Sequence, residues 1–432
     1  MRIEEIYKIY QQYPSIQTDS RKLLENDLFF ALKGDNFNGN LFAEQAIQKG
    51  AAYAFVDEKS AFTNDRIIET DDVLKTLQDL AHFHRQQFMN SLDGRAPIPF
   101  IGITGSNGKT TTKELIHQVL SSTYTTYTTQ GNLNNHIGIP LTLLKVRPDA
   151  QMVVIEMGAN HLREIAGYCE YAMPTHGLIT NCGKAHLEGF GSVENVKKAK
   201  GELFDYLRDH GGTAFVNADD IAVAALSNGL KEVLFYGNDG KDLHGKVAKS
   251  DPFLEVRIDG LMPLDIKTSL VGAYNFPNVA AAVCVGRYFD VPDEKIKMAI
   301  ENYTPSNSRS QLIKKDGNTI ILDAYNANPS SMKAAIENFA AMEGDKKIIL
   351  LGAMMELGNE SAQEHAAIIS LIDKYDWAAV ALVGESFRRL SHRYLSYDNA
   401  LQAREWMHAQ HFENAQILIK GSRSMQMEKV LE

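Results

Sequence analysis

The sequence comprises 432 residues, of which 44% are hydrophobic and 23% charged, and its formal net charge is −10. A chain of this length is too long for one hydrophobic core, so we expect roughly two to four domains of ordinary globular composition. The acidic balance is spread along the sequence without long basic runs, which argues against a nucleic-acid-binding surface as the main function.

The first part of the chain mixes short strands and helices. Apolar runs and helical spacing predict strands at residues 27–33 and 52–56 and helices at residues 41–49 and 73–88. The stretch 93–97 contains glycine and proline and is followed by Pro99, so we expect a linker there. We therefore place the first domain at residues 1–95.

The middle of the chain alternates strand-like and helix-like segments, as parallel α/β folds do. The predicted strands are at residues 100–104, 152–157, 176–181 and 213–217, and the predicted helices at residues 109–120, 193–207 and 275–288. Between residues 233 and 269 the pattern changes to short alternating segments, which indicates an antiparallel insertion or side sheet. We place the second domain at residues 96–310.

A new α/β set occupies the last part of the chain. We predict strands at residues 319–323, 347–351, 379–383 and 417–420 and helices at residues 330–341 and 362–374. The sequence shows neither an internal repeat nor a low-complexity tract. We place the third domain at residues 311–432.

Cysteine usage and hydropathy indicate the compartment. Cys169, Cys182 and Cys284 are odd in number and widely spaced, which argues against a disulfide framework or a zinc knuckle and suits a reducing environment. The N-terminus lacks the layout of a signal peptide, and no apolar run approaches the roughly 20 residues that span a bilayer. We expect a cytoplasmic monomer that acts on small molecules, without a membrane or nucleic-acid partner.

The stretch Gly102-Ile-Thr-Gly-Ser-Asn-Gly-Lys-Thr-Thr-Thr112 lies between a strand-like run and a helix-like segment. In a phosphate-binding loop, backbone N–H groups and the helix N-terminus point at the anion, and a lysine adds a mobile positive charge. The strict spacing needs a glycine where Ile103 stands, so the match is to a relative of the common loop. The alternative is an ordinary glycine-rich turn, but Gly108-Lys-Thr-Thr111 lies where a helix would start.

Three further side chains are candidates for chemistry beside this loop. Glu156 ends a predicted strand, where a Mg²⁺ ligand belongs, although a glutamate at a strand end can also face solvent. His186 lies in a glycine-rich loop after another strand and is equally compatible with a metal or phosphate contact and with a surface position. Lys200 belongs to a basic helix whose face either meets an anionic substrate or is solvated.

Three polar stretches also follow predicted strands or helices. Residues 131–140 contain three Asn and two Gly, residues 323–329 read Asp-Ala-Tyr-Asn-Ala-Asn-Pro, and residues 420–424 read Lys-Gly-Ser-Arg-Ser. Such stretches can bind the oxygen atoms of a ligand, but Asn and Gly are also common in connecting turns and as helix caps.

Taken in order, these stretches resemble the ATP-dependent Mur ligases and, within that family, the F-type enzymes. The likeness extends over nearly the whole chain, and nine signatures in register make it specific. They are Thr18-Asp-Ser-Arg21 with Phe30-Ala-Leu-Lys-Gly34, Thr104-Gly-Ser-Asn-Gly-Lys-Thr-Thr111, Gly131-Asn-Leu-Asn-Asn135, Glu156-Met-Gly-Ala-Asn-His161, His186-Leu-Glu-Gly-Phe-Gly191, Lys198-Ala-Lys-Gly-Glu202, Tyr325-Asn-Ala-Asn-Pro329, Glu356-Leu-Gly358 and Lys420-Gly-Ser-Arg423.

The resemblance implies an α/β protein of three domains. These would be an N-terminal UDP-substrate-binding domain, a central ATP-binding domain with a P-loop-type parallel sheet, and a C-terminal Rossmann-like domain that receives the amino substrate. The resemblance also implies a ligase of the cytoplasmic stage of peptidoglycan precursor synthesis. It would join D-alanyl-D-alanine to UDP-N-acetylmuramoyl-tripeptide through an acyl phosphate and form ADP and phosphate. The third peptide residue stays open between meso-diaminopimelate and L-lysine.

The resemblance further implies a role for each matching residue. The catalytic residues would be Lys109, His186 and Lys200, the last as a carbamylated lysine. Of two Mg²⁺ ions, one would be bound by Thr110 and Glu156 and the other by His186 and carbamylated Lys200. ATP would contact Gly105, Ser106, Asn107, Gly108, Lys109, Thr110, Thr111, Asn275, Arg309 and Asp323. The UDP end of the substrate would contact Thr18, Asp19, Ser20, Arg21, Lys33 and Gly34, and the muramoyl-peptide Asn132, Asn134 and Asn135. Further substrate-binding residues would be Asn160, His161, Tyr325, Asn326, Asn328, Glu356, Lys420, Ser422 and Arg423, with Tyr325, Asn326, Asn328 and Glu356 on the dipeptide side.

Two positions depart from the family pattern, since Tyr274 replaces a usual His and Ala353 a usual Asp. Three other functions compete with the F-type activity: an E-type ligase, which adds the third peptide residue, a folylpolyglutamate synthase, and a P-loop switch that signals by changing shape. The sequence lacks the Asp-Asn-Pro-Arg motif typical of E-type enzymes. A switch would need neither a UDP-binding domain nor the region around Lys200.

Overall fold

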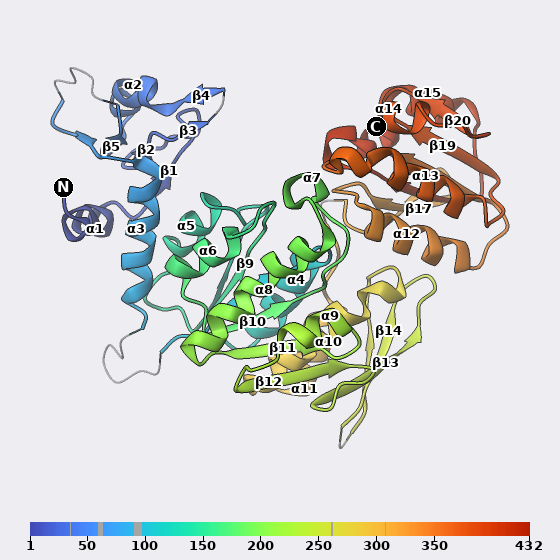
Figure 1. Ribbon diagram of the computed structural model, residues 1–432, viewed down its shortest axis with the longest axis horizontal. Helices are drawn as coiled ribbons and strands as arrows, with labels where there is room; N and C mark the ends of the chain where they lie inside the picture. Colours follow the sequence, from blue (N-terminus) through green and yellow to red (C-terminus); the bar gives the residue numbers. More distant parts are fainter. Residues whose placement is uncertain (35, 59–63, 90–96, 261, 307) are drawn as a thin grey trace.

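The computed structural model describes residues 1–34, 36–58, 64–89, 97–260, 262–306 and 308–432. The linker predicted at residues 93–97 therefore falls almost wholly outside the described residues. The chain forms three α/β bodies that follow one another from the N-terminal domain at one end to the C-terminal domain at the other (Figure 1). Among the described residues, no helix is both long and apolar enough to cross a membrane.

The N-terminal body is built on a parallel sheet of order β1-β2-β5-β6. Its elements are α1 (Ile3–Gln12), β1 (Ile16–Gln17), β2 (Leu28–Phe30), β3 (Lys33–Gly34), β4 (Phe37–Asn38), α2 (Ala43–Gln48), β5 (Tyr53–Val56), β6 (Ile67–Glu69) and α3 (Val73–Gln86). The strand predicted at residues 27–33 is too long. It ends at Phe30, because the N–H of Leu32 turns back to the Phe30 carbonyl at 2.9 Å, and Lys33 begins a separate hairpin.

The central body contains one sheet of order β15-β14-β13-β12-β11-β10-β7-β9-β8. Its strands are β7 (Phe100–Thr104), β8 (Thr126–Thr128), β9 (Met152–Glu156), β10 (His176–Ile179), β11 (Thr213–Asn217), β12 (Glu232–Gly237), β13 (Leu243–Lys249), β14 (Glu255–Ile258) and β15 (Leu264–Lys267). Only β13, β14 and β15 pair antiparallel. The insertion predicted at residues 233–269 is thus no separate sheet. β12 pairs parallel with both β11 and β13, which joins the antiparallel strands to the main sheet.

Helices cover both faces of the parallel part of this sheet, which explains why β7, β9 and β11 are buried along their whole length, whereas β13, β14 and β15 alternate between buried and exposed positions. The helices are α4 (Lys109–Ser121), α5 (Gly138–Leu143), α6 (Glu164–Ala172), α7 (Leu187–Phe190), α8 (Val193–His210), α9 (Ile221–Leu226), α10 (Phe276–Tyr288) and α11 (Asp293–Glu301). In β9, Met152 and Val154 join the core under α4 and α10, whereas Val153 and Ile155 join the core under α6 and α8.

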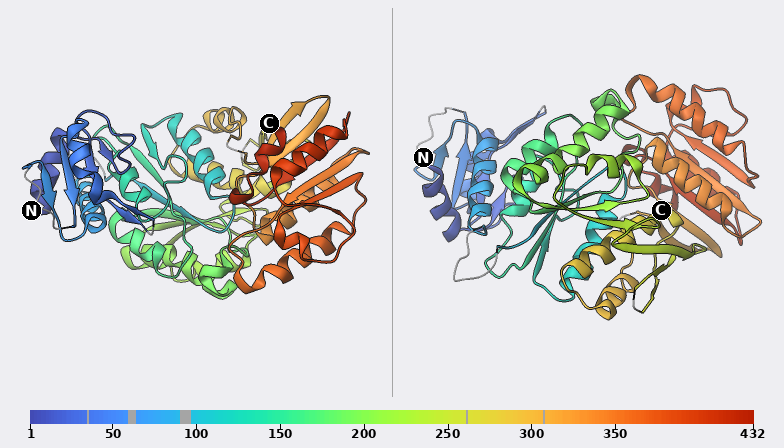
Figure 2. Two further views of the ribbon diagram at one scale, coloured as in Figure 1. Left: turned by 90° about the horizontal axis from the view of Figure 1, so that it is seen from above. Right: turned by 60° about the horizontal axis from the view of Figure 1, so that its bottom comes forward.

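The C-terminal body is a second open sheet, of order β16-β17-β21-β18-β19-β20, in which only β16 pairs antiparallel. Its elements are β16 (Gln311–Lys315), β17 (Asn318–Asp323), α12 (Pro329–Ala341), β18 (Lys347–Gly352), α13 (Ser361–Ile372), β19 (Ala379–Val383), α14 (Glu385–Arg388), β20 (Leu395–Tyr397), α15 (Ala400–Ala409) and β21 (Gln416–Lys420). Two further views show this body beside the central one, with the N-terminal body on the opposite side (Figure 2). The predicted three-domain α/β fold is confirmed.

Candidate active site

The loop between β7 and α4 has a shape that only glycine permits at two positions. Gly105 has φ +140° and Gly108 φ +80°, both left-handed values that favour glycine. A Cβ at Gly105 would lie 2.0 Å from the Thr180 hydroxyl, and one at Gly108 would lie 2.7 Å from Oδ1 of Asn278. The backbone therefore runs close to its neighbours, and the N-terminus of α4 is left open toward a ligand.

Lys109 opens α4 and folds back along this loop. Its Nζ donates to the carbonyls of Gly105 at 2.6 Å and Ser106 at 3.2 Å. Burial lowers the pKa of Lys109, although the Glu156 carboxylate nearby partly offsets the effect. The lysine and the loop together form a cationic, water-poor position suited to the oxygen atoms of a phosphate.

The loop after β10 holds the phosphate-binding loop in place. Asn181, which is not among the predicted site residues, donates from Nδ2 to the Asn107 carbonyl at 3.0 Å and accepts the Asn107 N–H at 3.1 Å. The Thr180 hydroxyl donates to the same carbonyl at 2.6 Å. A Thr-Asn pair at the end of a predicted strand is the sequence signal for this clamp, but the pairing itself depends on β7 and β10 being neighbours.

A carboxylate lies beside the loop at the end of the neighbouring strand β9. The Thr110 hydroxyl donates to Glu156 Oε1 at 3.1 Å, and Asn134 Nδ2 donates to the same oxygen at 2.7 Å. The other oxygen, Oε2, is buried and has no hydrogen-bond partner in the described part of the chain. Buried carboxylate oxygens are rarely left unpaired. This one is therefore available to a cation or to a donor on a ligand.

Lys200 lies on α8 and is only 1% exposed, so its helix face is not solvated. Its Nζ donates to the Ala159 carbonyl at 3.2 Å and lies 5.1 Å from the centre of the Phe190 ring. Burial and then the charge on Lys109 lower the pKa of Lys200 to about 7. A substantial fraction of this amine is therefore neutral near pH 7.

The C-terminal body touches the phosphate-binding side through polar pairs. Asn328, the N-cap of α12, donates from Nδ2 to Asn107 Oδ1 at 2.7 Å. His186 Nδ1 lies 2.5 Å from Glu356 Oε2, and this contact lowers the pKa of Glu356. We refer to these pairs, with the ion pair between Lys184 and Glu364 at 2.6 Å, as the C-terminal interface.

A row of side chains continues the site where the central body meets the C-terminal body. Asn278, also not predicted, accepts from the Thr112 hydroxyl at 3.0 Å and donates to Asn275 Oδ1 at 2.9 Å. Tyr274 stands at the position where the family pattern has His. Its hydroxyl lies 3.0 Å from the Ser310 hydroxyl.

Beyond this row lie Arg309 and Asp323, which are predicted nucleotide contacts, together with Tyr325 and Lys420 of the predicted substrate-binding set. The Arg309 guanidinium stacks on the Tyr325 ring at 3.6 Å, and the Lys420 ammonium pairs with Asp323 at 2.5 Å. Lys420 is 2% exposed, so this ion pair is buried. The residues form a flat, partly charged wall against which an aromatic base or a charged ligand group can pack.

These elements enclose a cleft of ≈ 830 Å³ between the central and C-terminal bodies. The predicted site residues that line it are Ser106, Asn107, Gly108, Lys109, Thr110, Thr111, Asn132, Asn134, Asn135, Glu156, Asn160, His186, Asn275, Arg309, Asp323, Tyr325, Asn326, Asn328, Glu356 and Lys420. Residues far apart in the sequence thus meet at the ends of β7, β9, β10, β17 and β21, as expected at the carboxyl edges of parallel sheets.

Several predicted residues do not line the cleft. They are Gly105, Lys200, His161, Ser422, Arg423 and the N-terminal set Thr18, Asp19, Ser20, Arg21, Lys33 and Gly34. Ser422 is buried and donates to the carbonyl of Ala353 at 2.7 Å, so it holds β18 and β21 together. Arg423 is exposed and pairs with Glu428 at 3.0 Å.

The charged residues of the N-terminal set are paired within the N-terminal body. The Arg21 guanidinium donates two hydrogen bonds to Asp19, each 2.8 Å long, and Lys33 pairs with Glu58. These residues lie in the N-terminal body, away from the phosphate-binding loop (Figure 1). A ligand that touches both regions has to be long enough to extend from one body to the next.

Across the described residues, no group of three or more His, Cys, Asp or Glu side chains is placed to hold a metal ion. A Mg²⁺ ion that is bound together with nucleotide phosphates does not require such a cluster, because one or two protein oxygens plus phosphate oxygens and water suffice. Thr110 and Glu156 provide two such oxygens side by side.

Fold and site together define a three-domain P-loop enzyme that handles a phosphorylated nucleotide in a cleft between two α/β bodies. The chain belongs to the Mur ligase family. The family model described as Mur ligase middle domain matches residues 103–286, the one described as Mur ligase, glutamate ligase domain, residues 308–429, and the one described as Mur ligase family, catalytic domain, residues 12–88. The predicted family is thereby confirmed.

Individual relatives resemble the chain over almost its full length. A protein of Bacillus subtilis (strain 168) named UDP-N-acetylmuramoyl-tripeptide--D-alanyl-D-alanine ligase is 34% identical over 96% of this chain and 92% of its own length. A crystal structure of MurF from Acinetobacter baumannii has a TM-score of 0.87 at 27% identity and covers 98% and 97% of the two chains. The MurF ligase of Thermotoga maritima in complex with ADP has a TM-score of 0.84 at 26% identity, with 96% of each chain covered.

Proposed function

We infer that the protein is an ATP-dependent ligase that joins D-alanyl-D-alanine to UDP-N-acetylmuramoyl-tripeptide in the synthesis of peptidoglycan precursors. The observation that carries this inference is the cleft itself, where a phosphate-binding loop with Lys109, Thr110 and Glu156 faces a Rossmann-like body. The similarity to ligases of this name over 96% of the chain supports the choice of substrates.

The chemistry accounts for the residues that are present. The carboxylate of the tripeptide is a poor electrophile and has to be activated before an amine can attack it. Its oxygen therefore first attacks the γ-phosphorus of ATP, which gives an acyl phosphate and releases ADP. The amine of the dipeptide then attacks the acyl carbon through a tetrahedral intermediate, and phosphate leaves. The protein contributes positioning and charge neutralisation rather than a nucleophile. Lys109 and the loop N–H groups supply the positioning and the charge neutralisation at the phosphates. Asn181 holds the loop in place.

Two Mg²⁺ ions are part of the proposal. The hydroxyl of Thr110 and the unpaired Oε2 of Glu156 fit one ion, because Mg²⁺ prefers hard oxygen ligands. For the second, His186 would offer Nε2, while its Nδ1 lies 2.5 Å from Glu356 Oε2. Bound there, the ions would neutralise charge on the phosphate oxygens.

We also propose that Lys200 is carbamylated. A carbamate forms when a neutral amine attacks carbon dioxide and loses a proton, and the lowered pKa of Lys200 favours the neutral amine. Its Nζ lies beside the Ala159 carbonyl, and Ala159 itself lines the cleft. The carbamate would turn a buried cation into an anion next to the second metal ion, together with His186.

We propose that the remaining predicted residues contact the substrates. The N-terminal set from Thr18 to Arg21 with Lys33 and Gly34 would bind the UDP end, and Asn132, Asn134 and Asn135 the muramoyl-peptide. The spatial separation of these two groups suits a long substrate that extends between the bodies. The dipeptide would lie against the wall formed by the C-terminal body. Domain limits of 1–95, 96–310 and 311–432, a monomeric state and a cytoplasmic location complete the proposal.

The test measures phosphate release from ATP with UDP-N-acetylmuramoyl-tripeptide, Mg²⁺ and D-alanyl-D-alanine, and identifies the product by mass. We expect release that depends on both substrates and a pentapeptide product. Lys109→Met should lower kcat about 1000-fold, because a charge on the transferring phosphoryl group is no longer neutralised. An exposed-lysine control, Lys8→Met, should leave kcat unchanged.

Other outcomes separate the competing functions. If the enzyme ignores the dipeptide but adds a single diamino acid to a UDP-linked dipeptide, it is an E-type ligase. If it adds glutamate to a folate, it is a folylpolyglutamate synthase. If ATP is hydrolysed regardless of any acceptor, or not at all, the switch hypothesis gains and the ligase assignment is wrong.

A further inference from the structure

The asparagine-rich loop between β8 and α5 runs beside the carboxylate at the end of β9. Asn134 of this loop donates from Nδ2 to Glu156 Oε1 at 2.7 Å, and its own carbonyl accepts the Gly158 N–H at 2.7 Å. An ionised carboxylate only accepts hydrogen bonds, so the atom that faces it is the amide nitrogen and not the amide oxygen. Asn134 is therefore tied to the end of β9 through its side chain and its backbone, with its amide in one orientation.

The two oxygen atoms of Glu156 have different surroundings. Oε1 accepts from the Thr110 hydroxyl at 3.1 Å as well as from Asn134, whereas Oε2 is buried without a partner in the described part of the chain. The residue is only 2% exposed, so water does not readily replace a missing donor. Rotation of the carboxylate about its last bond would exchange the two oxygens, and the two donors oppose this rotation. They keep Oε2 as the oxygen that is left for a ligand.

The start of the loop is held by the central body. The Thr129 hydroxyl accepts the backbone N–H of Glu156 at 3.0 Å, and the Thr129 carbonyl accepts from Lys113 Nζ on α4 at 2.9 Å. Thr129 is fully buried and Lys113 is 3% exposed, so neither contact competes with bulk water. The segment before Asn134 is thus fixed to both α4 and β9.

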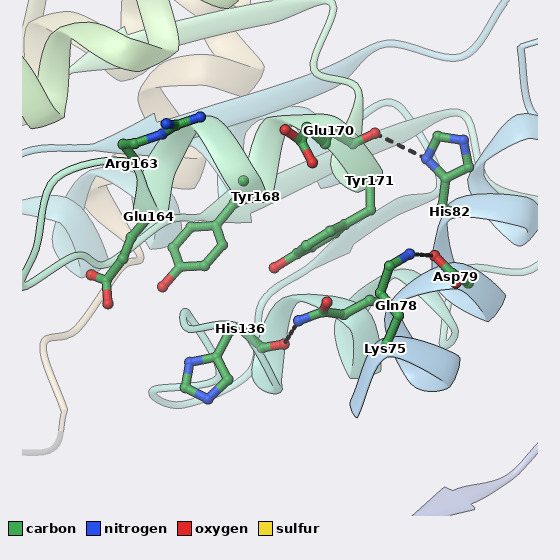
Figure 3. A pocket seen from close by; sticks show the side chains of 11 residues that line it. Lys75, Gln78, Asp79, His82, His136, Arg163, Glu164, Tyr168, Glu170 and Tyr171 are labelled. Atoms are coloured by element: carbon green, nitrogen blue, oxygen red, sulfur yellow. Dashed lines mark hydrogen bonds and ion pairs between the residues drawn. The ribbon is translucent and has the colours of Figure 1, made fainter. Parts of the chain in front are cut away.

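The end of the loop is held by the N-terminal body and by the next helix. Gln78 Nε2 on α3 donates to the His136 carbonyl at 3.1 Å (Figure 3). Asn135 Oδ1 accepts two N–H groups at the start of α5, at 3.2 and 2.9 Å. Because the loop is held on both sides of Asn134, this side chain has little freedom to leave Glu156. Such support is what a residue that orients another side chain requires.

We propose that Asn134 is a positioning residue for Glu156, which it holds so that Oε2 stays free for a Mg²⁺ ion that is bound together with the nucleotide phosphates. This assignment rests on the proposed function, which places one Mg²⁺ at Thr110 and Glu156. It adds a role to the muramoyl-peptide contact proposed above, because Glu156 does not use the amide oxygen of Asn134. Groups that orient a metal ligand typically contribute about 10- to 100-fold to metal affinity.

The loss of the amide donor has a specific consequence. Oε1 would keep only the Thr110 hydroxyl, which is itself expected at the ion, so the carboxylate could turn. Mg²⁺ demands a nearly ideal octahedral arrangement of its ligands, and a displaced oxygen weakens its binding. The effect should appear wherever Mg²⁺ strengthens nucleotide binding and should vanish when the ion is removed.

The test measures the Kd of the non-hydrolysable ATP analogue AMP-PNP by calorimetry, once in excess Mg²⁺ and once in excess EDTA, without tripeptide. The ratio of the two Kd values gives the contribution of the ion, and the value in EDTA shows whether a variant still folds its nucleotide site. The variants are Asn134→Ala, Asn134→Leu, Glu156→Ala and the protein that carries both alanine changes. The control is Asn228→Ala, an exposed asparagine after α9.

Both Asn134 variants should reduce the ratio about tenfold and leave the Kd in EDTA within about twofold of the wild-type value. At saturating ATP and tripeptide, the Mg²⁺ concentration for half-maximal phosphate release should rise by a similar factor. Asn134→Ala should add nothing to Glu156→Ala, because no carboxylate is left to position. Asn228→Ala should match the wild-type protein in every measurement.

These readouts separate the positioning role from the ligase function. An unchanged ratio in the Asn134 variants, or an equal effect of Asn134→Ala with and without Glu156, overturns the positioning role even if the pentapeptide is formed. A reduced ratio that depends on Glu156, in a protein that forms no pentapeptide, keeps the positioning role and removes the ligase function. If Mg²⁺ does not strengthen nucleotide binding and no pentapeptide forms, both are wrong.

Discussion

The central domain meets its two neighbours in different ways. Toward the N-terminal domain it packs against α3, whose Leu77 and Leu80 are fully buried and whose Arg85 is 1% exposed; we call this the α3 interface. The Arg85 guanidinium donates to the carbonyls of Ala172 at 3.0 Å and Met173 at 2.9 Å at the end of α6. Toward the C-terminal domain the contacts include, besides the three polar pairs of the C-terminal interface, backbone N–H groups of Lys184, Glu188 and Glu343 that donate to Ser330 Oγ, the Glu356 carbonyl and Asp251 Oδ2.

This difference indicates which domain can move when substrates bind. Separating the α3 interface would expose apolar surface and break the hydrogen bonds and ring stacking of Arg85, so it is costly at every stage of a reaction cycle. Polar pairs exchange with water at little net cost. We therefore expect the first two domains to behave as one unit and the C-terminal domain to open and close against them (hypothesis). Hydrogen exchange that shows early opening of the α3 interface would contradict this.

The strongest test of the α3 interface is Arg85→Ala. The change leaves two helix-end carbonyls without donors and a cavity over the Phe100 ring, on which the guanidinium stacks at 3.6 Å. The free energy of unfolding should fall by about 3 kcal/mol in denaturant titrations. Arg389→Ala, on the surface, should change it by less than about 0.5 kcal/mol. A loss below about 1 kcal/mol for Arg85→Ala would mean that the interface does not depend on this cation.

The α3 interface should also respond to pH through His84. This residue is buried, accepts the Tyr7 hydroxyl at Nδ1 and donates from Nε2 to the Val146 carbonyl, and burial lowers its pKa to about 4. Between pH 6.5 and pH 4 the unfolded chain binds the additional proton, so stability rises with pH there and is lost as pH falls.

From pH 7 to pH 5 the wild-type protein should therefore lose about 2 kcal/mol of unfolding free energy through this histidine. His84→Gln removes the titrating group. The unfolding free energy that this variant loses from pH 7 to pH 5 should therefore be smaller by about 2 kcal/mol than the wild-type loss. His408→Gln, an exposed control in α15, should keep the wild-type slope. Equal slopes in all three proteins would show that His84 does not stay neutral in the fold.

At the C-terminal interface we expect effects on activity rather than on stability. Glu364→Gln removes the charge of a carboxylate whose partner, Lys184, lies on the other domain. kcat/KM should fall about fivefold, because the closed arrangement loses roughly 1 kcal/mol, while the unfolding free energy changes by less than about 0.5 kcal/mol. Lys184→Gln and the variant that carries both changes complete a double-mutant cycle. Additive effects of the two single changes would show that the pair is not coupled in catalysis.

The smallest expected effect is that of Asn328→Asp. The N-cap of α12 is retained, because aspartate caps helices as well as asparagine does, but the Nδ2 donor to Asn107 is lost. The KM for ATP should rise about threefold, since one neutral hydrogen bond to the phosphate-binding loop is removed. Asn399→Asp changes the N-cap of α15 and is the matched control. The same increase in KM in both variants would indicate a general effect of charge.

Much of the site could be predicted because its residues stand at the ends of strands or in the loops that follow them. Lys109, Glu156, His186 and Asp323 stand at strand or loop ends, and parallel pairing brings such ends to one edge. Asn181 and Asn278 could not be recognised in the same way, because their roles depend on contacts to residues 74 and 166 positions earlier in the sequence. The edge strands β16 and β20 were also not predicted, since short half-exposed strands have a weak pattern.

The sequence by itself determined the alternation of strands and helices around the site, the phosphate-binding loop and membership of the Mur ligase family, because these depend on local spacing and on residue identity. The tertiary structure alone decided that Lys200 is buried, that a fixed interface flanks the cleft on one side and a polar one on the other, and that Asn134 donates to Glu156. Burial and unpaired hydrogen-bonding groups are properties of surfaces brought together from distant segments, and no local pattern of residues specifies them.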